Sequence, residues 1–171
     1  NCEQLKTFYI GKAFRGKINY GEEGDPDTLF LYYAPIRLIQ IDKENTSYQL
    51  QNEILYTRDG HILCQALKND NADSQLTIPS CVTEIADGAF YRNSEFGAIE
   101  VKGSLERIGI SAFACADVGS FYVKGGVNYL DRGSFYQSAI SEWRCHGGVK
   151  KYEKSAFQDV DATNGYAIDM N

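Results

Sequence analysis

The sequence predicts a β-rich solenoid, in which short coils stack along one axis and share a continuous core. A small residue followed by phenylalanine recurs in the second half of the chain with spacings of 23, 22 and 22 residues, and these phenylalanines are Phe90, Phe113, Phe135 and Phe157. An apolar-x-apolar triplet recurs in the same register between them. Because one coil of this length cannot bury its apolar face alone, such a period indicates stacked coils.

Length and charge limit the remaining possibilities. The 171 residues suffice for a core without a metal or disulfide staple. A net charge of −6 argues against a nucleic-acid binder, because phosphates require a positive surface. No apolar run approaches the length of a membrane-spanning helix. We expect one solenoid domain over residues 1–171, with a partial repeat and an acidic loop insertion (1–35), a strand and β-hairpin (36–66), and regular coils with the C-terminal end (67–171).

The first 35 residues are the least regular part of the chain. Residues 2–11 resemble the tail of one repeat running into the next, which would make the native protein longer. The alternative is that Cys2 is a lipidated cysteine near a trimmed start. The acidic stretch from Gly21 to Asp27 predicts a loop insertion.

The middle of the chain predicts a strand followed by a hairpin. Residues 38–41 are apolar enough for a strand, and Asp59-Gly60 stands between two further apolar stretches. Asp-Gly favours a two-residue hairpin turn, in which both positions adopt positive φ. We expect this hairpin to project from the edge of the solenoid.

Each later coil contains one triplet and one following apolar pair. A triplet predicts a short strand whose outer side chains face inward and whose middle side chain faces outward. The triplets are Ile99–Val101, Phe121–Val123 and Trp143–Cys145. The pairs that point back inside are Leu105 and Ile108, Val127 and Leu130, and Val149 and Tyr152. The pattern therefore predicts one parallel sheet of short strands.

The coils resemble a known family, the BspA-like or treponemal-type leucine-rich repeats, whose consensus is roughly L-x-x-I-x-I-P-x-x-V-x-x-I-G-x-x-A-F-x-x-C. Residues 76–90 match it closely, residues 105–115 match its second half, and residues 38–48 are similar to a strand and "V-D-x-x-N-x-x-Y" segment common in the family. The resemblance covers residues 36–160 and extends to 2–14, whereas 15–35 do not fit. It implies a leucine-rich-repeat-like solenoid, secretion or cell-surface display, and adhesion to host or neighbouring-cell macromolecules.

The last coils depart from the consensus. They lack its proline and carry aromatic or sulfur-containing residues in place of leucine and isoleucine, namely Phe121, Trp143, Cys145 and Tyr152.

The sequence offers little for catalysis or metal binding. The five cysteines include no C-x-x-C pair and are expected to be free, mostly buried apolar residues. Cys145 and His146 are adjacent on a strand and point to opposite faces, so they cannot form a nucleophile–base pair. Two oxygen-rich stretches, 69–74 and 159–165, lack residues that a calcium loop requires. We therefore expect no enzyme, no metal and no cofactor.

The candidate binding residues are those that the repeat turns outward. The middle residues of the strands are Tyr9, Gln40, Thr77, Glu100, Tyr122 and Arg144, and two lysines, Lys102 and Lys124, follow at the rim. The lysines stack on neighbouring strands about 4.8 Å apart, where like charges repel. Tyrosine and arginine are enriched in binding hot spots, although solvated turn residues would give the same pattern.

These observations predict a non-catalytic extracellular or cell-surface module that binds a protein or glycan on a host or neighbouring cell, with lipid anchoring through Cys2 as one option. A passive spacer or targeting module of a larger secreted protein is the alternative. An enzyme assembled from residues of several coils is the least favoured hypothesis. The oligomeric state stays open.

Overall fold

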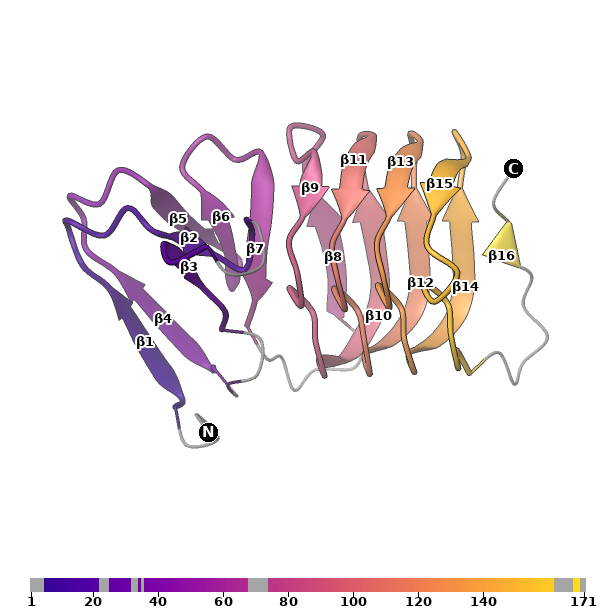
Figure 1. Cartoon of the computed structure of the whole chain (residues 1–171), viewed down its shortest axis with the longest axis horizontal. Coiled ribbons are helices and arrows are strands. Elements are labelled where there is room, and N and C mark those ends of the chain that lie inside the picture. Colours follow the sequence, from indigo (N-terminus) through magenta and orange to yellow (C-terminus); the bar gives the residue numbers. More distant parts are fainter. Residues whose placement is uncertain are drawn as a thin grey trace.

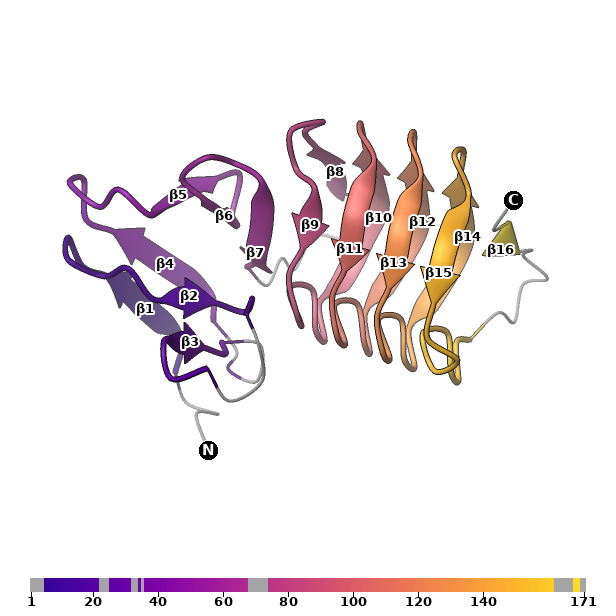
Figure 2. The ribbon, with the colours of Figure 1, turned by 45° about the horizontal axis from the view of Figure 1, so that its top comes forward.

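The chain folds into a β-solenoid whose coils stack along one axis (Figure 1). The computed structural model describes residues 5–21, 25–31, 34, 36–67, 74–161 and 168–169, and within these residues it contains strands β1–β16 and no helix. Two β-layers face each other along the solenoid and enclose its core (Figure 2). The predicted solenoid of stacked coils is confirmed.

The first layer is a parallel sheet built on the predicted triplets. Its order is β16-β14-β12-β10-β8, with bounds Ile168–Asp169, Ala139–Cys145, Asp117–Val123, Ser94–Val101 and Ser74–Ile78. The triplets form only the last part of β10, β12 and β14, which are seven or eight residues long. These strands are therefore longer than the three-residue strands that the triplets predict. The reason is that Phe96, Val118 and Ile140, upstream of the triplets, are also buried and continue the layer over the core.

The second layer is a sheet that the sequence pattern did not predict. Its order is β15-β13-β11-β9-β7-β6-β5, and its parallel part consists of Val149–Tyr152, Val127–Leu130, Leu105–Ile108, Glu84–Ile85 and Ile62–Ala66. The apolar pairs that return to the core are the ends of these strands. Both end residues of β11 and of β13 are fully buried, and the two residues between them are not.

Tyr152, the last residue of β15, does not follow this rule. It was expected to point inside, but 50% of its surface is exposed. Strand β15 is the edge of its sheet, so no further coil within the described residues covers this bulky ring.

The predicted hairpin is present, but it does not project from the edge. Strand β6 (Ile54–Thr57) pairs antiparallel with β7, and β7 pairs in parallel with β9, so the hairpin continues the second layer. A second antiparallel partner, β5 (Tyr48–Gln51), extends it further. Of the two turn residues only Gly60 has a positive φ, of 77°. The Asp59 carboxylate instead accepts hydrogen bonds from the His61 amide and the Thr57 hydroxyl.

The N-terminal part forms two small parallel sheets beside the hairpin. Strand β1 (Thr7–Ile10) pairs with β4 (Leu38–Ile41), and β2 (Lys17–Ile18) pairs with β3 (Thr28–Leu29). The acidic insertion joins β2 to β3, and its residues 22–24 lie outside the described residues. Cys2 and the oxygen-rich stretch at 69–73 also lie outside them.

Two hydrophobic cores meet at the hairpin. Tyr56 and Leu63 belong to the solenoid core, whereas Leu55 and Cys64 belong to the N-terminal core. Because successive side chains of a strand point to opposite faces, β6 and β7 form a wall shared by both cores. This sharing explains why all four residues of β6 are buried.

The recurring phenylalanines form a stacked ladder along the solenoid. Ring centroids are 4.6 Å apart for Phe90 and Phe113, 5.0 Å for Phe113 and Phe135, and 5.2 Å for Phe135 and Phe157. The rings lie within 9° of parallel. The first three of these rings are fully buried.

The described cysteines are free, as expected: Cys64, Cys81, Cys115 and Cys145. Cys64 and Cys145 are buried, and burial raises the pKa of the Cys64 thiol. Cys81, however, is exposed and does not serve as a core residue.

Candidate binding surfaces

Four of the predicted residues form one row across the first layer. The strand register places Thr77 beside Glu100, Glu100 beside Tyr122, and Tyr122 beside Arg144. Thr77 and Arg144 are exposed, and Glu100 and Tyr122 are half-buried. We call this row of four residues the outer strip. It runs along the solenoid axis because parallel strands in register bring the same position of every coil together.

The two charged residues of the outer strip are paired with oppositely charged residues beside it. The Glu100 carboxylate lies 2.5 Å from the ammonium group of Lys102 and 3.3 Å from that of Lys124. The expected repulsion between the two lysines is therefore offset by an anion between them. The hydrogen bond from Lys102, together with the contact from Lys124, lowers the pKa of Glu100. Arg144 similarly contacts Glu142, at 2.5 Å.

The remaining two candidates lie on a different sheet. Tyr9 and Gln40 are paired neighbours on β1 and β4, and both are exposed. The Tyr9 hydroxyl donates a hydrogen bond to Asp42, at 3.0 Å. Tyr9 and Gln40 thus form a second small surface and do not extend the outer strip.

The second layer carries an outward row that sequence reasoning missed. Register pairs Glu84 with Arg107, Arg107 with Tyr129, and Tyr129 with Lys151. These four residues are spaced 23, 22 and 22 positions apart, like the phenylalanines. That shared spacing was the signal that could have identified them, had the second sheet been recognised.

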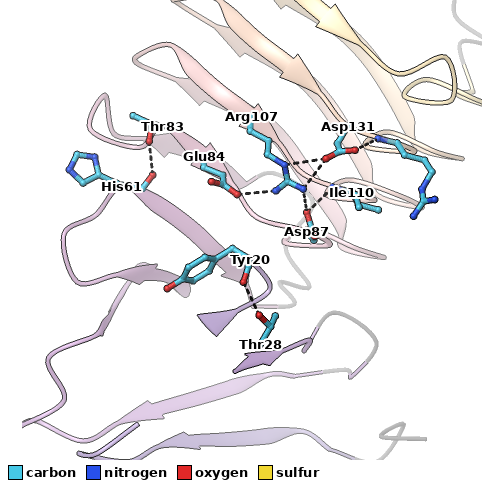
Figure 3. A network of polar contacts seen from close by, with 10 residues as sticks. Tyr20, Thr28, His61, Thr83, Glu84, Asp87, Arg107, Ile110 and Asp131 are labelled. Carbon is cyan, nitrogen blue, oxygen red and sulfur yellow. Dashed lines mark hydrogen bonds and ion pairs between the residues drawn. The ribbon is translucent and has the colours of Figure 1, made fainter. Parts of the chain in front are cut away.

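Arg107 is the centre of an ionic network on this layer, shown in Figure 3. Its guanidinium lies 2.9 Å from Glu84, 2.6 Å from Asp87 and 2.9 Å from Asp131. Asp87 also accepts a hydrogen bond from the Ile110 amide, at 2.8 Å. One arginine thus joins three successive coils.

Burial and charge oppose each other in this network. Burial raises the pKa of both Glu84 and Asp87, and the nearby Arg107 cation only partly reverses this effect. Burial disfavours the charged form of Arg107 as well, but the three carboxylates outweigh it and raise its pKa. The network carries one positive and three negative groups, so it has an acidic excess.

Tyr129 continues the row beyond the network. Its hydroxyl donates a hydrogen bond to Glu153 at 2.6 Å, which raises the pKa of Tyr129 to about 12. The Lys151 ammonium lies 5.3 Å from the centre of the Tyr129 ring. This distance is typical of a cation–π contact.

A groove of about 600 Å³ lies between the N-terminal part and the turns of the solenoid. Its lining residues come from the segments that follow β2 and β3 and from four successive coils, and include Phe30, Asp87, Ser111, Arg132, Tyr136 and Ser155.

No group of metal-ligating side chains is found among the residues that the structure describes. The same residues include no helix that is long and apolar enough to cross a membrane.

Two solved structures match the chain. The crystal structure of the pneumococcal vaccine antigen PcpA superposes with a TM-score of 0.72 at 20% identity, and the match covers 94% of this chain and 38% of that one. A leucine-rich repeat protein from Eubacterium ventriosum gives a TM-score of 0.39 at 14% identity, over 91% of this chain and 59% of that one. The chain therefore spans about 38% of the pneumococcal antigen's length.

No curated protein matches the sequence significantly. The family model for the BspA-type leucine-rich repeat region does match, with six copies over residues 39–164. This range covers most of the chain and coincides with the hairpin and the coils. The chain belongs to the BspA-type leucine-rich repeat family.

Proposed function

We propose that the chain is a non-catalytic, extracellular or cell-surface module that binds a protein or glycan on a host or neighbouring cell through the outer strip. The alignment of the four strip residues is the observation that carries the proposal. Their strands are hydrogen-bonded on both sides except at β8, so the backbone beneath them is held firmly. A rigid surface loses little conformational entropy on binding.

The chemistry of the strip favours a protein partner over a glycan. Tyr122 offers amphipathic ring area, and Arg144 offers a planar set of donors. The three charges of Lys102, Glu100 and Lys124 leave a net excess of one positive charge at the rim. Such an excess would attract an acidic surface and make association depend on salt.

An array experiment tests this proposal. The full chain is applied to arrays of purified extracellular proteins and of defined glycans, beside the double variant Tyr122→Ala/Arg144→Ala. We expect the variant to lose affinity for the bound protein at least tenfold, because both hot-spot side chains are removed. The matched control is Lys150→Ala/Tyr152→Ala, which removes an exposed cation and an exposed aromatic ring from the other layer.

The spacer alternative rests on the internal pairing of the charges on the strip. A surface whose cations already contact Glu100 and Glu142 needs no partner. If the folded wild-type chain binds nothing on either array, the spacer function replaces the binding function. If the strip variant binds as tightly as the control variant, the contact surface lies elsewhere on the chain.

A further inference from the structure

We propose that the groove beside the Arg107 network is a separate site for a short, unbranched, uncharged oligosaccharide that lies along the solenoid axis. This site is on a different layer from the outer strip and does not depend on the function proposed above. Shape, hydrogen-bonding groups, charge and aromatic surface each support this ligand class.

The shape of the groove follows the repeat. Ser111, Gly133 and Ser155 line it from equivalent positions of three successive coils, and Tyr136 and Gln158 are equivalent in the last two. Gly133 has no side chain, which leaves space between the two serines. Gly21 and Phe30 of the N-terminal part also line it, so the groove has a wall beside the first coil.

The spacing of the coils suits a chain of sugar rings. Parallel strands lie about 4.8 Å apart, and successive coils repeat at this distance. One pyranose unit of an unbranched oligosaccharide has a similar length. Each sugar ring would therefore meet the same set of side-chain positions on the next coil.

Five polar side chains of the groove have no partner in the part of the protein that the structure describes. Within the described residues, no hydrogen bond or ion pair is made by the hydroxyls of Ser111, Tyr136 and Ser155, by the side-chain amide of Gln158 or by the guanidinium of Arg132. Hydroxyl and amide groups both donate and accept, as sugar hydroxyls do. The groove thus offers a mixed set of partners suited to a polyol.

The charge of the groove favours a neutral ligand over a polyanion. Asp87 and Arg107, which line it, already belong to a network with three carboxylates and one guanidinium. Arg132 adds one cation, so the combined site still carries an excess of one negative charge. A polyanion would meet this excess at close range, whereas an uncharged sugar would not.

Aromatic side chains line the groove at two places. Tyr136 is half-buried, and Phe30 is 36% exposed. The faces of such rings stack on the apolar C–H faces of pyranose rings, while the sugar hydroxyls bind to the polar groups around them.

The test measures binding of simple sugars to the full chain. The probes are cellotriose, maltotriose, mannotriose and triacetylchitotriose, each beside its monosaccharide, with saturation-transfer NMR to detect binding and calorimetry to measure it. We expect at least one trisaccharide to bind with a Kd below about 10 mM, and at least about fivefold more tightly than its monosaccharide, because the site spans three coils.

Two variants remove or fill the site. Arg132→Ala/Tyr136→Ala removes a donor and a stacking surface, and Ser155→Trp places a large ring in the groove. We expect each to weaken the trisaccharide at least about tenfold, whereas the strip variant Tyr122→Ala/Arg144→Ala changes it less than about twofold. Circular dichroism and the melting transition establish that each variant is folded.

Three results would overturn the proposal. In the first, none of the four trisaccharides binds to the wild-type chain. In the second, both groove variants bind like the wild type. In the third, a heparin-derived trisaccharide binds more tightly than every neutral one, with affinity that falls steeply with salt, which would assign the groove to polyanions. A loss confined to the strip variant would place sugar binding on the outer strip instead.

Discussion

Phe113 lies at the centre of the solenoid, between the stacked rings of Phe90 and Phe135. It also meets Phe121 of the first layer edge-on, with ring centroids 5.0 Å apart. Stacked and edge-on ring pairs each add to the free energy that burial alone contributes. Phenylalanine rings therefore connect neighbouring coils along the axis and join the turn after β11 to the first layer.

We expect Phe113→Ala to reduce the free energy of unfolding by about 3–5 kcal/mol, because the side chain is fully buried and its removal leaves a cavity. Urea denaturation followed by circular dichroism measures this loss. Phe113→Leu is the control and should lose less, since most of the volume is kept. A loss below about 1 kcal/mol for the alanine variant would contradict the stacking role of Phe113.

At Arg107 the stability of the fold depends on charge, because one cation compensates three carboxylates. We expect Arg107→Met to cost about 3 kcal/mol at pH 7, because removal of one partner leaves partly buried charges unpaired. Arg107→Lys is the control and should lose less, since it keeps the charge but not the planar geometry.

The loss in Arg107→Met should shrink as the pH falls. Without the cation, the pKa values of Glu84 and Asp87 rise further above their unfolded values, so the folded state binds more protons than the unfolded state. Stability then falls as pH rises and is recovered on acidification. Urea denaturation of the variant and of the wild type at pH 7 and at about pH 4.5 measures this change. The wild type shows how much of the pH dependence comes from exposed groups that both proteins share. An equal loss at both pH values would show that the network is not ionic.

At the scale of elements, the close approach of successive coils depends on Gly109, at the end of β11. A Cβ atom at this position would lie 2.7 Å from the backbone nitrogen of Asp87 and 2.9 Å from the carbonyl carbon of Ala86. It would also overlap the Asp87 carboxylate. The glycine therefore permits both the coil spacing and the contact between Asp87 and Arg107.

We expect Gly109→Ala to destabilise the fold by about 1–3 kcal/mol, because the added methyl group overlaps the backbone of the preceding coil. The free energy of unfolding in urea measures the effect. Gly11→Ala is the matched control, since its nearest neighbour would be a side-chain atom of Tyr9 at 3.7 Å. A loss in Gly109→Ala no larger than in Gly11→Ala would mean that the coils can separate without cost.

At the scale of the whole molecule, the N-terminal part and the solenoid are joined through buried contacts. Asn19 is fully buried and donates hydrogen bonds to the Gln65 side chain at 2.7 Å and to the Cys64 carbonyl at 3.0 Å. Its own carbonyl accepts a hydrogen bond from the Asp87 amide, at 2.7 Å. The wall of β6 and β7 and this single asparagine tie the two cores together.

Hydrogen exchange should reveal a gradient of stability along the axis. Interior coils have a neighbour on each side, whereas β15 is the edge of its sheet. We expect the paired amides of β11 and β12 to exchange at least roughly 100-fold more slowly than those of β15, because terminal repeats open independently. Exchange of the full chain followed by NMR checks this. Equal protection of β11, β12 and β15 would indicate that the solenoid opens only as one unit.

The sequence alone determined the repeat, its period and the residues that fill it. The 22–23-residue spacing led to the stacked phenylalanines and the strand middles, because any residue that recurs once per coil must form a row along the axis. It also indicated the hairpin at Asp59-Gly60. These features depend on the alternation of inward and outward residues along a strand and on the stacking of equal coils. Both produce a repeating pattern in the sequence.

Only the tertiary structure decided how the rows face one another. The inward pairs form a second sheet, the hairpin becomes a wall between two cores, and Tyr9 and Gln40 lie apart from the outer strip. The Arg107 network unites residues up to 47 positions apart, from Glu84 to Asp131. The row of Glu84 and Arg107 is periodic in the sequence, but the contacts of Arg107 with Asp87 and Asp131 depend on the turn geometry of each coil, which the spacing does not give.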